Sequence, residues 1–173
     1  MSKTKSVKKL VICGLLTALS IIFGKFLNIP VGDTLRFSFE NTPLFLAGYM
    51  FGPLAAGSVA FVADILGSIL KGYTINPLIT VGAVFVGVSS GFLFRFLKKS
   101  PLFLKTLITV GISHVGGSVL IKTFGISLMT GTPFFALLPL RAINYLIMIF
   151  IDVAVIYFIL KNRSFKRLME SNV

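Results

Sequence analysis

Residues 44–70 read "LFLAGYMFGPLAAGSVAFVADILGSIL", an apolar run of 27 residues with one charged side chain, Asp64. About 20 apolar residues are enough for a helix to cross the roughly 30 Å hydrocarbon core of a membrane. The run is therefore either one overlong, tilted helix or two shorter helices that meet at Gly52-Pro53. Proline lacks a backbone donor and fits the first turn of a helix, which favours the break.

The composition indicates a membrane protein. Of 173 residues, 55% are hydrophobic and 13% are charged, and the mean hydropathy is +0.96, which leaves too few polar side chains to cover a soluble globule. The single cysteine, Cys13, provides no disulfide framework. The other runs close to the length of a membrane helix are residues 10–23, 78–96, 102–120 and 140–160.

Charge decides between one helix and two in residues 44–70. The 17 Lys and Arg outnumber the five Asp and Glu, and they gather near the N-terminus, in residues 95–105 and near the C-terminus. Loops rich in Lys and Arg stay in the cytoplasm, and six spans place all three clusters there, whereas five spans force two clusters outside. The sequence therefore predicts an all-α integral membrane protein, a six-helix bundle in one domain of residues 1–173. The break falls at residues 51–53, and both termini are cytoplasmic.

The break leaves a short second helix. Residues 42–51 extend only about 15 Å. A helix that ends inside the hydrocarbon leaves backbone groups unpaired unless protein surrounds it. We therefore expect this helix either to begin earlier or to be shielded by its neighbours.

The sequence also excludes several classes of function. It has no G-x-x-x-x-G-K-[ST] loop and no H-E-x-x-H motif, and one histidine and one cysteine leave no plausible nucleophilic triad. Its basic residues flank apolar runs rather than alternate with aromatic ones, so nucleic acid is not an expected partner. We expect no enzyme activity, no cofactor and no metal. Uptake against a gradient must then draw its energy from another chain or from an ion gradient, although no inverted repeat of a secondary transporter is evident.

The loops that this topology places outside, approximately residues 25–42, 71–76 and 122–139, are basic. Together with the adjacent Arg141 they carry five Lys and Arg against two acids, a net charge of +3, and an anionic ligand from outside is one physical reason for it. For the three lysines, the alternative is that they reach along apolar surface to the headgroups. The basic residues are Lys25, Arg36, Lys71, Lys122 and Arg141, and the acids are Asp33 and Glu40.

In the first outer loop, "RFSFEN" at residues 36–41 alternates polar and aromatic side chains. The alternation predicts a short extended segment in which Arg36, Ser38 and Glu40 face one way. Such a segment could cover a cavity as a lid. The alternative is a surface ion pair between Arg36 and Glu40.

Two acids fall within predicted spans, where an ionisable group is costly and tends to face the protein interior. Asp64, in the outer half of the third helix, either accepts hydrogen bonds from a ligand or pairs with Arg141. For Asp152, in the inner half of the last helix, we expect a structural role or a partner-facing one. His114 is expected in hydrogen-bonded packing or at a ligand, and Asn76 either caps the fourth helix or contacts the ligand.

Small residues four positions apart occur in three places. Such pairs let two helices approach closely in a bilayer, either within the bundle or between this chain and another protein. The pairs are Gly14 and Ala18, Gly48 and Gly52, and Gly87 and Gly91.

Several of these segments together resemble a known family. The basic N-terminus, "GLLTALS" in the first helix, the outer "RFSFENTPLFLAGYMFGP" and the following "AGSVAFVADILGSIL" are similar to the substrate-binding S components of energy-coupling factor (ECF) vitamin transporters. "RFSFENTP" and "ADILG" point most closely to the folate-specific members. The resemblance spans nearly the whole chain by length and helix count, and its specific motifs lie in residues 14–68.

The resemblance implies a subunit that captures folate or a related vitamin from outside, in a cavity near the outer ends of the last three helices. It further implies docking on a membrane scaffold, the T component, which carries two cytosolic ABC ATPases in the cell membrane of a prokaryote. The family docks through an A-x-x-x-A motif on the first helix, and this chain has Gly14 and Ala18 there. The glycine departs from the motif but keeps the small size.

The ligand implied by the resemblance suggests roles for particular side chains. Arginine offers a planar pair of donors to a carboxylate, carboxylates and amides accept from the amino and ring N–H groups of a pterin, and phenylalanine stacks on its faces. The alternatives are an S component for thiamin or pantothenate, and a self-sufficient small secondary transporter or channel. The candidate substrate-binding residues are Arg36, Phe37, Glu40, Asn41, Asp64, Asn76, His114, Arg141 and Asn144.

Overall fold

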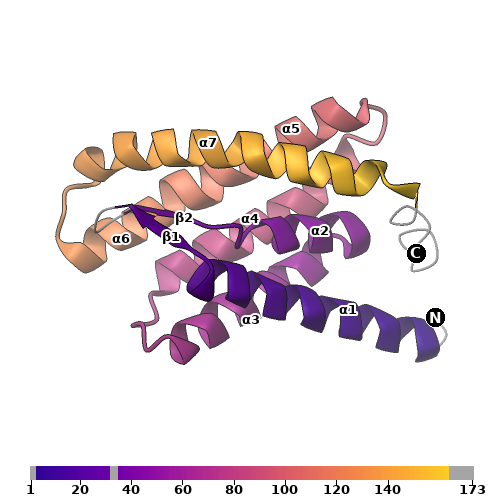
Figure 1. The fold of residues 1–173 in the computed structure, drawn as a ribbon, viewed down its shortest axis with the longest axis horizontal. Coiled ribbons are helices and arrows are strands. Elements are labelled where there is room, and N and C mark those ends of the chain that lie inside the picture. Colours follow the sequence, from indigo (N-terminus) through magenta and orange to yellow (C-terminus); the bar gives the residue numbers. More distant parts are fainter. Residues whose placement is uncertain (1–2, 32–34, 164–173) are drawn as a thin grey trace.

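A computed structural model describes residues 3–31 and 35–163, and Figure 1 shows a bundle of helices with one short hairpin. Five described stretches are long and apolar enough to cross a membrane, and with the shorter apolar helix α2 they confirm the predicted six-helix membrane bundle. The elements, with η for a π-helical segment, are α1 (Lys3–Ile21), η1 (Ile22–Phe26), β1 (Ile29–Val31), β2 (Leu35–Phe37), α2 (Thr42–Phe51), α3 (Pro53–Leu70), α4 (Pro77–Phe96), α5 (Leu102–Ser113), η2 (His114–Ile121), α6 (Lys122–Thr130) and α7 (Phe134–Lys161).

The apolar run of residues 44–70 forms two helices. Gly52 lies between α2 and α3 with φ +86°, a conformation that residues with a Cβ rarely adopt, and Pro53 opens α3. Nη2 of Arg95 donates to the carbonyl of Phe51 at 3.3 Å. The predicted break is therefore confirmed, and Arg95 satisfies a carbonyl that the break leaves free.

The short helix α2 is surrounded by protein. All ten of its residues are buried, and it packs against α1, α3, α4 and α7. Phe45, at 0% exposure, is among the largest fully buried side chains. Shielding by neighbours, one of the two expectations for this helix, is confirmed.

The last two spans depart from the prediction. α5, η2 and α6 form one continuous helical stretch that ends at Thr130, and α7 begins at Phe134. The predicted outer loop over residues 122–139 is wrong, because a lysine in an apolar run resembles a boundary although apolar sequence continues beyond Lys122. The actual connection is short, and Gly131, at φ +70°, ends α6.

Two segments of the described chain are π-helical, a form that is rare and often found at functional sites. η1 ends the first span, and η2 interrupts the fifth. η1 carries Lys25, and η2 carries His114 and Ser118. All three take part in the polar contacts described below.

The hairpin strands β1 and β2 run antiparallel, with Pro30 opposite Arg36. The extended structure predicted for "RFSFEN" is confirmed at Arg36 and Phe37, whereas Glu40 already lies in the turn that leads into α2. Figure 1 shows the hairpin between α1 and α7, and β2 contacts α7. Asp33 lies outside the described residues.

The three pairs of small residues divide between the interior and the surface of the bundle. Gly48 faces Gly91, and Gly87 faces the backbone of α3, so that an added Cβ would lie 2.8 Å or less from a backbone atom. Internal packing is confirmed for these glycines. Gly14 differs, since an added Cβ there meets nothing within 4 Å, and both Gly14 and Ala18 are exposed on α1.

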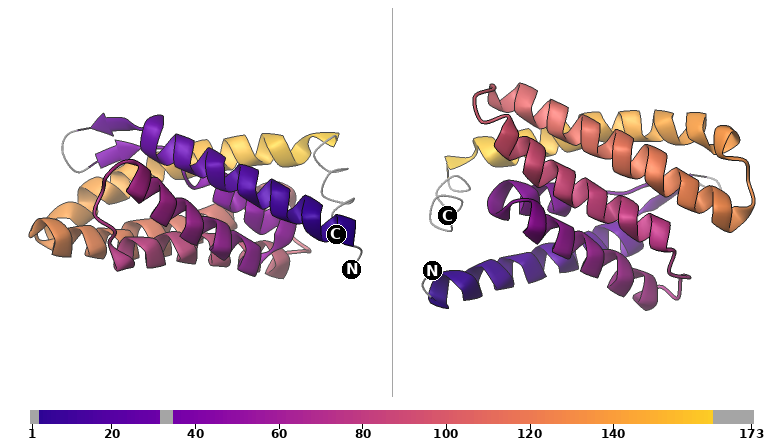
Figure 2. Two further views of the ribbon diagram at one scale, coloured as in Figure 1. Left: turned by 90° about the horizontal axis from the view of Figure 1, so that it is seen from below. Right: turned by 180° about the vertical axis from the view of Figure 1, so that it is seen from behind.

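The described parts of the three basic clusters lie at one end of the bundle. The start of α1, the α4–α5 connection and the end of α7 meet there, whereas the hairpin, the α3–α4 connection and the α6–α7 connection lie at the opposite end (Figures 1 and 2). Because the start of α1 and the end of α7 lie at the same end, the arrangement agrees with an even number of membrane-spanning helices. The side of the membrane on which the termini lie stays a prediction.

Candidate ligand-binding cavity

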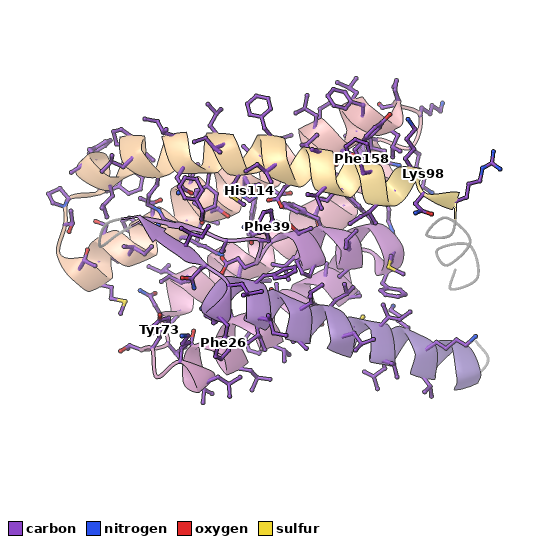
Figure 3. The ribbon with its side chains drawn as sticks, in the orientation of Figure 1. Phe26, Phe39, Tyr73, Lys98, His114 and Phe158 are labelled. Carbon is purple, nitrogen blue, oxygen red and sulfur yellow. The ribbon has the colours of Figure 1, made fainter. Side chains whose placement is uncertain are left out.

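A cavity of about 460 Å³ lies at the end of the bundle that carries the hairpin. Figure 3 shows Tyr73, one of its lining residues, at this end and Lys98 at the other. The volume is in the range of small-molecule sites. The predicted ligand residues in its lining are Glu40, Asp64, Asn76, Arg141 and Asn144, and its further charged or aromatic residues are Lys25, Tyr73, Lys122 and Tyr145.

A short ion pair joins Glu40 and Lys122 in the wall. Nζ of Lys122 lies 2.7 Å from Oε1 of Glu40, and the lysine is 5% exposed. Gly24 allows this approach, because a Cβ there would lie 2.8 Å from Oε2. Burial raises the pKa of Glu40, but the positive charges of Lys122, Lys25 and Arg141 outweigh it and lower the pKa to about 2. Glu40 is therefore ionised at neutral pH.

Asp64, on α3, has partners other than the predicted Arg141. Oγ1 of Thr80 on α4 donates to Oδ2 of Asp64 at 2.6 Å, and Nζ of Lys25 lies 3.8 Å from Oδ1. Pairing with Arg141, one of the two alternatives for Asp64, is wrong, because η1 brings Lys25 to the carboxylate instead. Asp64 also lines the cavity, where a ligand can reach it.

Arg141 projects from α7 and is 6% exposed. Its Nε donates to Oγ1 of Thr123 at 2.8 Å, and its Nη2 donates to the carbonyl of Ser118 at 3.4 Å. The guanidinium carbon lies 5.4 Å from the ring centre of Tyr145. No ion pair between described side chains includes Arg141. The guanidinium of Arg141 acts on Glu40 electrostatically but has no carboxylate within ion-pair distance among the described residues. A buried guanidinium in this state, in a cavity wall, suits an anion.

Asn76 and Asn144 line the cavity, whereas Asn41, the neighbour of the lining residue Glu40, is not in the lining itself. Asn144 and Asn41 are 4% and 2% exposed, and within the described chain Nδ2 of Asn144 and Oδ1 of Asn41 have no hydrogen-bond partner. Both polar atoms of Asn76 have a partner within the chain, since its Oδ1 accepts from the backbone of Leu78 at 2.9 Å and its Nδ2 donates to the carbonyl of Gly125 at 2.8 Å. Capping by Asn76 is confirmed, and the other two amides keep polar atoms for a ligand.

His114 lies outside the cavity lining and is fully buried beside α7 (Figure 3). Its Nε2 is 2.9 Å from Oδ2 of Asp152, whose Oδ1 accepts from the hydroxyl of Thr42. The rings of Phe45 and Tyr145 each lie 5.3 Å from the imidazole. Hydrogen-bonded packing is confirmed for His114, as is a structural role for Asp152. A partner-facing Asp152 is wrong, because no part of it is exposed.

Two predicted ligand residues belong to the hairpin. The side chain of Arg36 lies outside the described residues. Phe37 is half-buried and is not among the residues that line the cavity. Their contacts with a ligand, and the function of this segment as a lid, stay predictions.

The sequence interpretation missed the two lysines of the cavity. Headgroup contact is wrong for Lys25 and Lys122, whose side chains are 14% and 6% exposed and pair with acids. For Lys122 a signal existed, since a lysine with apolar sequence on both sides tends to face the protein interior. Thr80, Tyr73 and Tyr145 belong to no motif that singles them out.

Comparison with known proteins agrees with this architecture. Residues 4–163 match the model of a family described as "ECF-type riboflavin transporter, S component". The chain belongs to this family. A curated relative, the folate transporter FolT of Clostridium novyi (strain NT), is 35% identical over 66 residues. That match covers 38% of this S component and 38% of the relative, so it spans well under half the length of either.

Solved structures extend the likeness to nearly the whole chain. The crystal structure of FolT bound with folic acid has a TM-score of 0.73 and 28% identity, and the match covers 87% of this S component and 89% of that protein. The S component for biotin from an ECF-type ABC transporter has a TM-score of 0.74, with coverage of 94% and 95%. At 18% identity it shows the fold alone. The resemblance to ECF S components is thus confirmed. The descriptions of the family and of these relatives name riboflavin, folate and biotin, so they do not identify one vitamin for this chain.

Proposed function

We propose that this S component captures folate at the outer side of the membrane and passes it to an ATP-driven partner module. The observation that carries the proposal is Arg141, a buried guanidinium outside every ion pair of the described residues, in the wall of a cavity large enough for a vitamin. The described lining holds three bases against two acids, an excess of one positive charge. An anionic ligand balances that excess.

Folate matches the cavity at both of its ends. Its glutamate carboxylates suit the planar donors of Arg141, and the amino and ring N–H groups of its pterin suit the carboxylate of Asp64. The free amide atoms of Asn144 and Asn41 provide further polar contacts. We assign Arg36 and Phe37 of the hairpin to the cover over the ligand. The likeness to FolT bound with folic acid supports the same ligand.

Other vitamins match the cavity less well. Riboflavin, the vitamin in the family description, is uncharged at neutral pH and would leave Arg141 buried without a hydrogen-bonded anion. Thiamin is a cation, which the excess positive charge disfavours. Pantothenate is an anion but has no aromatic ring with paired donors for Asp64. The cavity therefore favours folate among these ligands.

We further propose that the partner module consists of a membrane T component and two cytosolic ABC ATPases, in the cell membrane of a prokaryote with both termini of this chain cytoplasmic. The sequence has no nucleotide-binding loop of its own. Gly14 and Ala18 are exposed on α1 beside Leu10 and Leu15, which are 74% and 65% exposed. A small-residue pair on such an apolar face lets a partner helix approach closely.

Isothermal titration of the purified chain in detergent tests the ligand. We expect one-to-one binding of folic acid, and no binding of riboflavin, biotin, thiamin or pantothenate at the same concentrations. Binding of one of the other vitamins instead would overturn the assignment of folate but keep the capture function. Binding of none would count against capture by this chain alone and favour a channel or secondary transporter.

A further inference from the structure

The two acid–base pairs of the cavity differ in tightness. Nζ of Lys122 lies 2.7 Å from Glu40, within hydrogen-bond distance, whereas Nζ of Lys25 lies 3.8 Å from Asp64, beyond it. The Lys122–Glu40 pair is therefore a charge-assisted hydrogen bond, and the Lys25–Asp64 pair is an electrostatic contact alone. The hydrogen bond that Asp64 lacks from Lys25 comes from Thr80 at 2.6 Å.

Thr80 is well placed to fix the orientation of the Asp64 carboxylate. It is 6% exposed and lies one turn after Asn76, whose cap on α4 and bond to Gly125 hold that end of the helix. The hydroxyl of Thr80 has one proton, and the 2.6 Å contact with Oδ2 of Asp64 is shorter than its 3.3 Å contact with the carbonyl of Asn76. A branched Cβ further restricts its rotation. Thr80 therefore holds one oxygen of Asp64 and leaves the other toward Lys25.

The ammonium group of Lys25 has a second interaction partner besides Asp64, the ring of Tyr73. Its stem packs against α3, since a Cβ on Gly67 would lie 3.0 Å from its Cε, and its Nζ lies 5.7 Å from the ring centre of Tyr73. Both Lys25 and Tyr73 line the cavity. An ammonium that gives up Asp64 thus keeps a cation–π contact without leaving the cavity.

We propose that Lys25 is a displaceable counter-ion of Asp64 and that Thr80 is the positioning residue that presents this carboxylate to a ligand with two adjacent N–H donors. A ring amino group next to a ring N–H forms charge-assisted hydrogen bonds with a carboxylate, and these are stronger than a 3.8 Å contact with an ammonium. The inference rests on the proposed capture function and adds two residues that decide specificity. It selects amino-substituted heterocycles over rings that lack the donor pair.

The test compares variants and ligands by isothermal titration of the purified full chain. The ligands are folic acid and 2-desaminofolic acid, which lacks one of the two donors. Thr80→Val should weaken folic acid binding about tenfold and 2-desaminofolic acid binding by less than about twofold, because only the donor pair needs the oriented carboxylate. Thr80→Ser restores the hydroxyl and should recover affinity. Thr106→Val removes a buried hydroxyl that bonds only within α5, so it is the matched control and should bind both ligands like the wild type.

Lys25→Met tests the counter-ion independently and covers the case in which Thr80→Val does not fold. Removing a competing ammonium should leave folic acid affinity unchanged or raise it by up to about tenfold. A loss of about tenfold or more would overturn the inference, because Lys25 would then contact the ligand directly. Equal effects of Thr80→Val on both ligands would also overturn it. If the wild-type chain fails to bind folic acid at all, the proposed function falls; if it binds and the variants behave otherwise than expected, only this inference falls.

Discussion

Asp64 and Asp152 both lie within membrane-spanning helices, but their surroundings differ. Asp152 is fully buried, and its two oxygens are engaged by Thr42 and His114. The side chain of Asp64 is 11% exposed at a cavity, with one oxygen bonded to Thr80 and the other only near a lysine. An acid whose hydrogen bonds are complete holds helices together, whereas an acid with acceptor capacity left over is available to a ligand. The completeness of hydrogen bonding thus separates the two roles.

The largest effect is expected from Asp152→Ala, because it breaks the buried contacts of Asp152 with Thr42 and His114. Removing one member of a buried pair leaves His114 and Thr42 without a partner, which costs about 3–5 kcal/mol of the free energy of unfolding. Asp64→Ala is the matched comparison and should cost clearly less stability. Thermal unfolding of both variants in the same detergent checks the difference. Equal losses of stability would show that complete hydrogen bonding does not mark the structural acid.

Much of this fold follows from local chemistry that one sequence displays. Gly52 and Pro53 mark the break between α2 and α3, because the first suits a positive φ and the second begins a helix. The count of spans follows from where the basic residues lie. The helix boundaries at the cavity end were less predictable. Lys122 suggested the start of a loop, but it begins helix α6.

The pairings within the cavity could not be predicted from spacing. Arg141 and Asp64 are the obvious partners by charge, but π-helical η1 places Lys25 at Asp64. A π-helical segment changes which residues share a face, and nothing in the sequence around Lys25 marks it. Contacts between distant segments, such as that of Lys122 with Glu40, depend on the packing of whole helices.

Arg141→Met should produce the next largest effect, and it acts on the ligand rather than on the fold. Loss of charge-assisted hydrogen bonds to a carboxylate should weaken folic acid binding by about 2–3 kcal/mol, or roughly 30- to 150-fold. Arg141→Lys should recover part of the affinity, since an ammonium keeps the charge but lacks the planar pair of donors. Isothermal titration measures all of these variants.

Arg95→Met is the matched control, because Arg95 lies at the end of α4 away from the cavity and bonds to the carbonyl of Phe51. It should lower stability slightly and leave the affinity for folic acid unchanged. If Arg141→Met bound folic acid as tightly as Arg95→Met does, the guanidinium of Arg141 would have no role in recognition. The proposed ligand class would then lose its main support.

The smallest effect on the purified chain is expected from Gly14→Leu, because Gly14 lies neither at the cavity with Asp64 nor at the buried contacts of Asp152. An added side chain at Gly14 meets nothing within 4 Å, so stability should stay within about 0.5 kcal/mol of the wild type and folic acid affinity should not change. Uptake of labelled folic acid into vesicles that also contain the partner module should be lost, because a leucine keeps the partner helix at a distance. Gly111→Leu, at another open glycine on α5, should leave uptake intact. Loss of binding together with uptake would mean that α1 supports the cavity rather than the partner, and the exposed pair of small residues would then need another explanation.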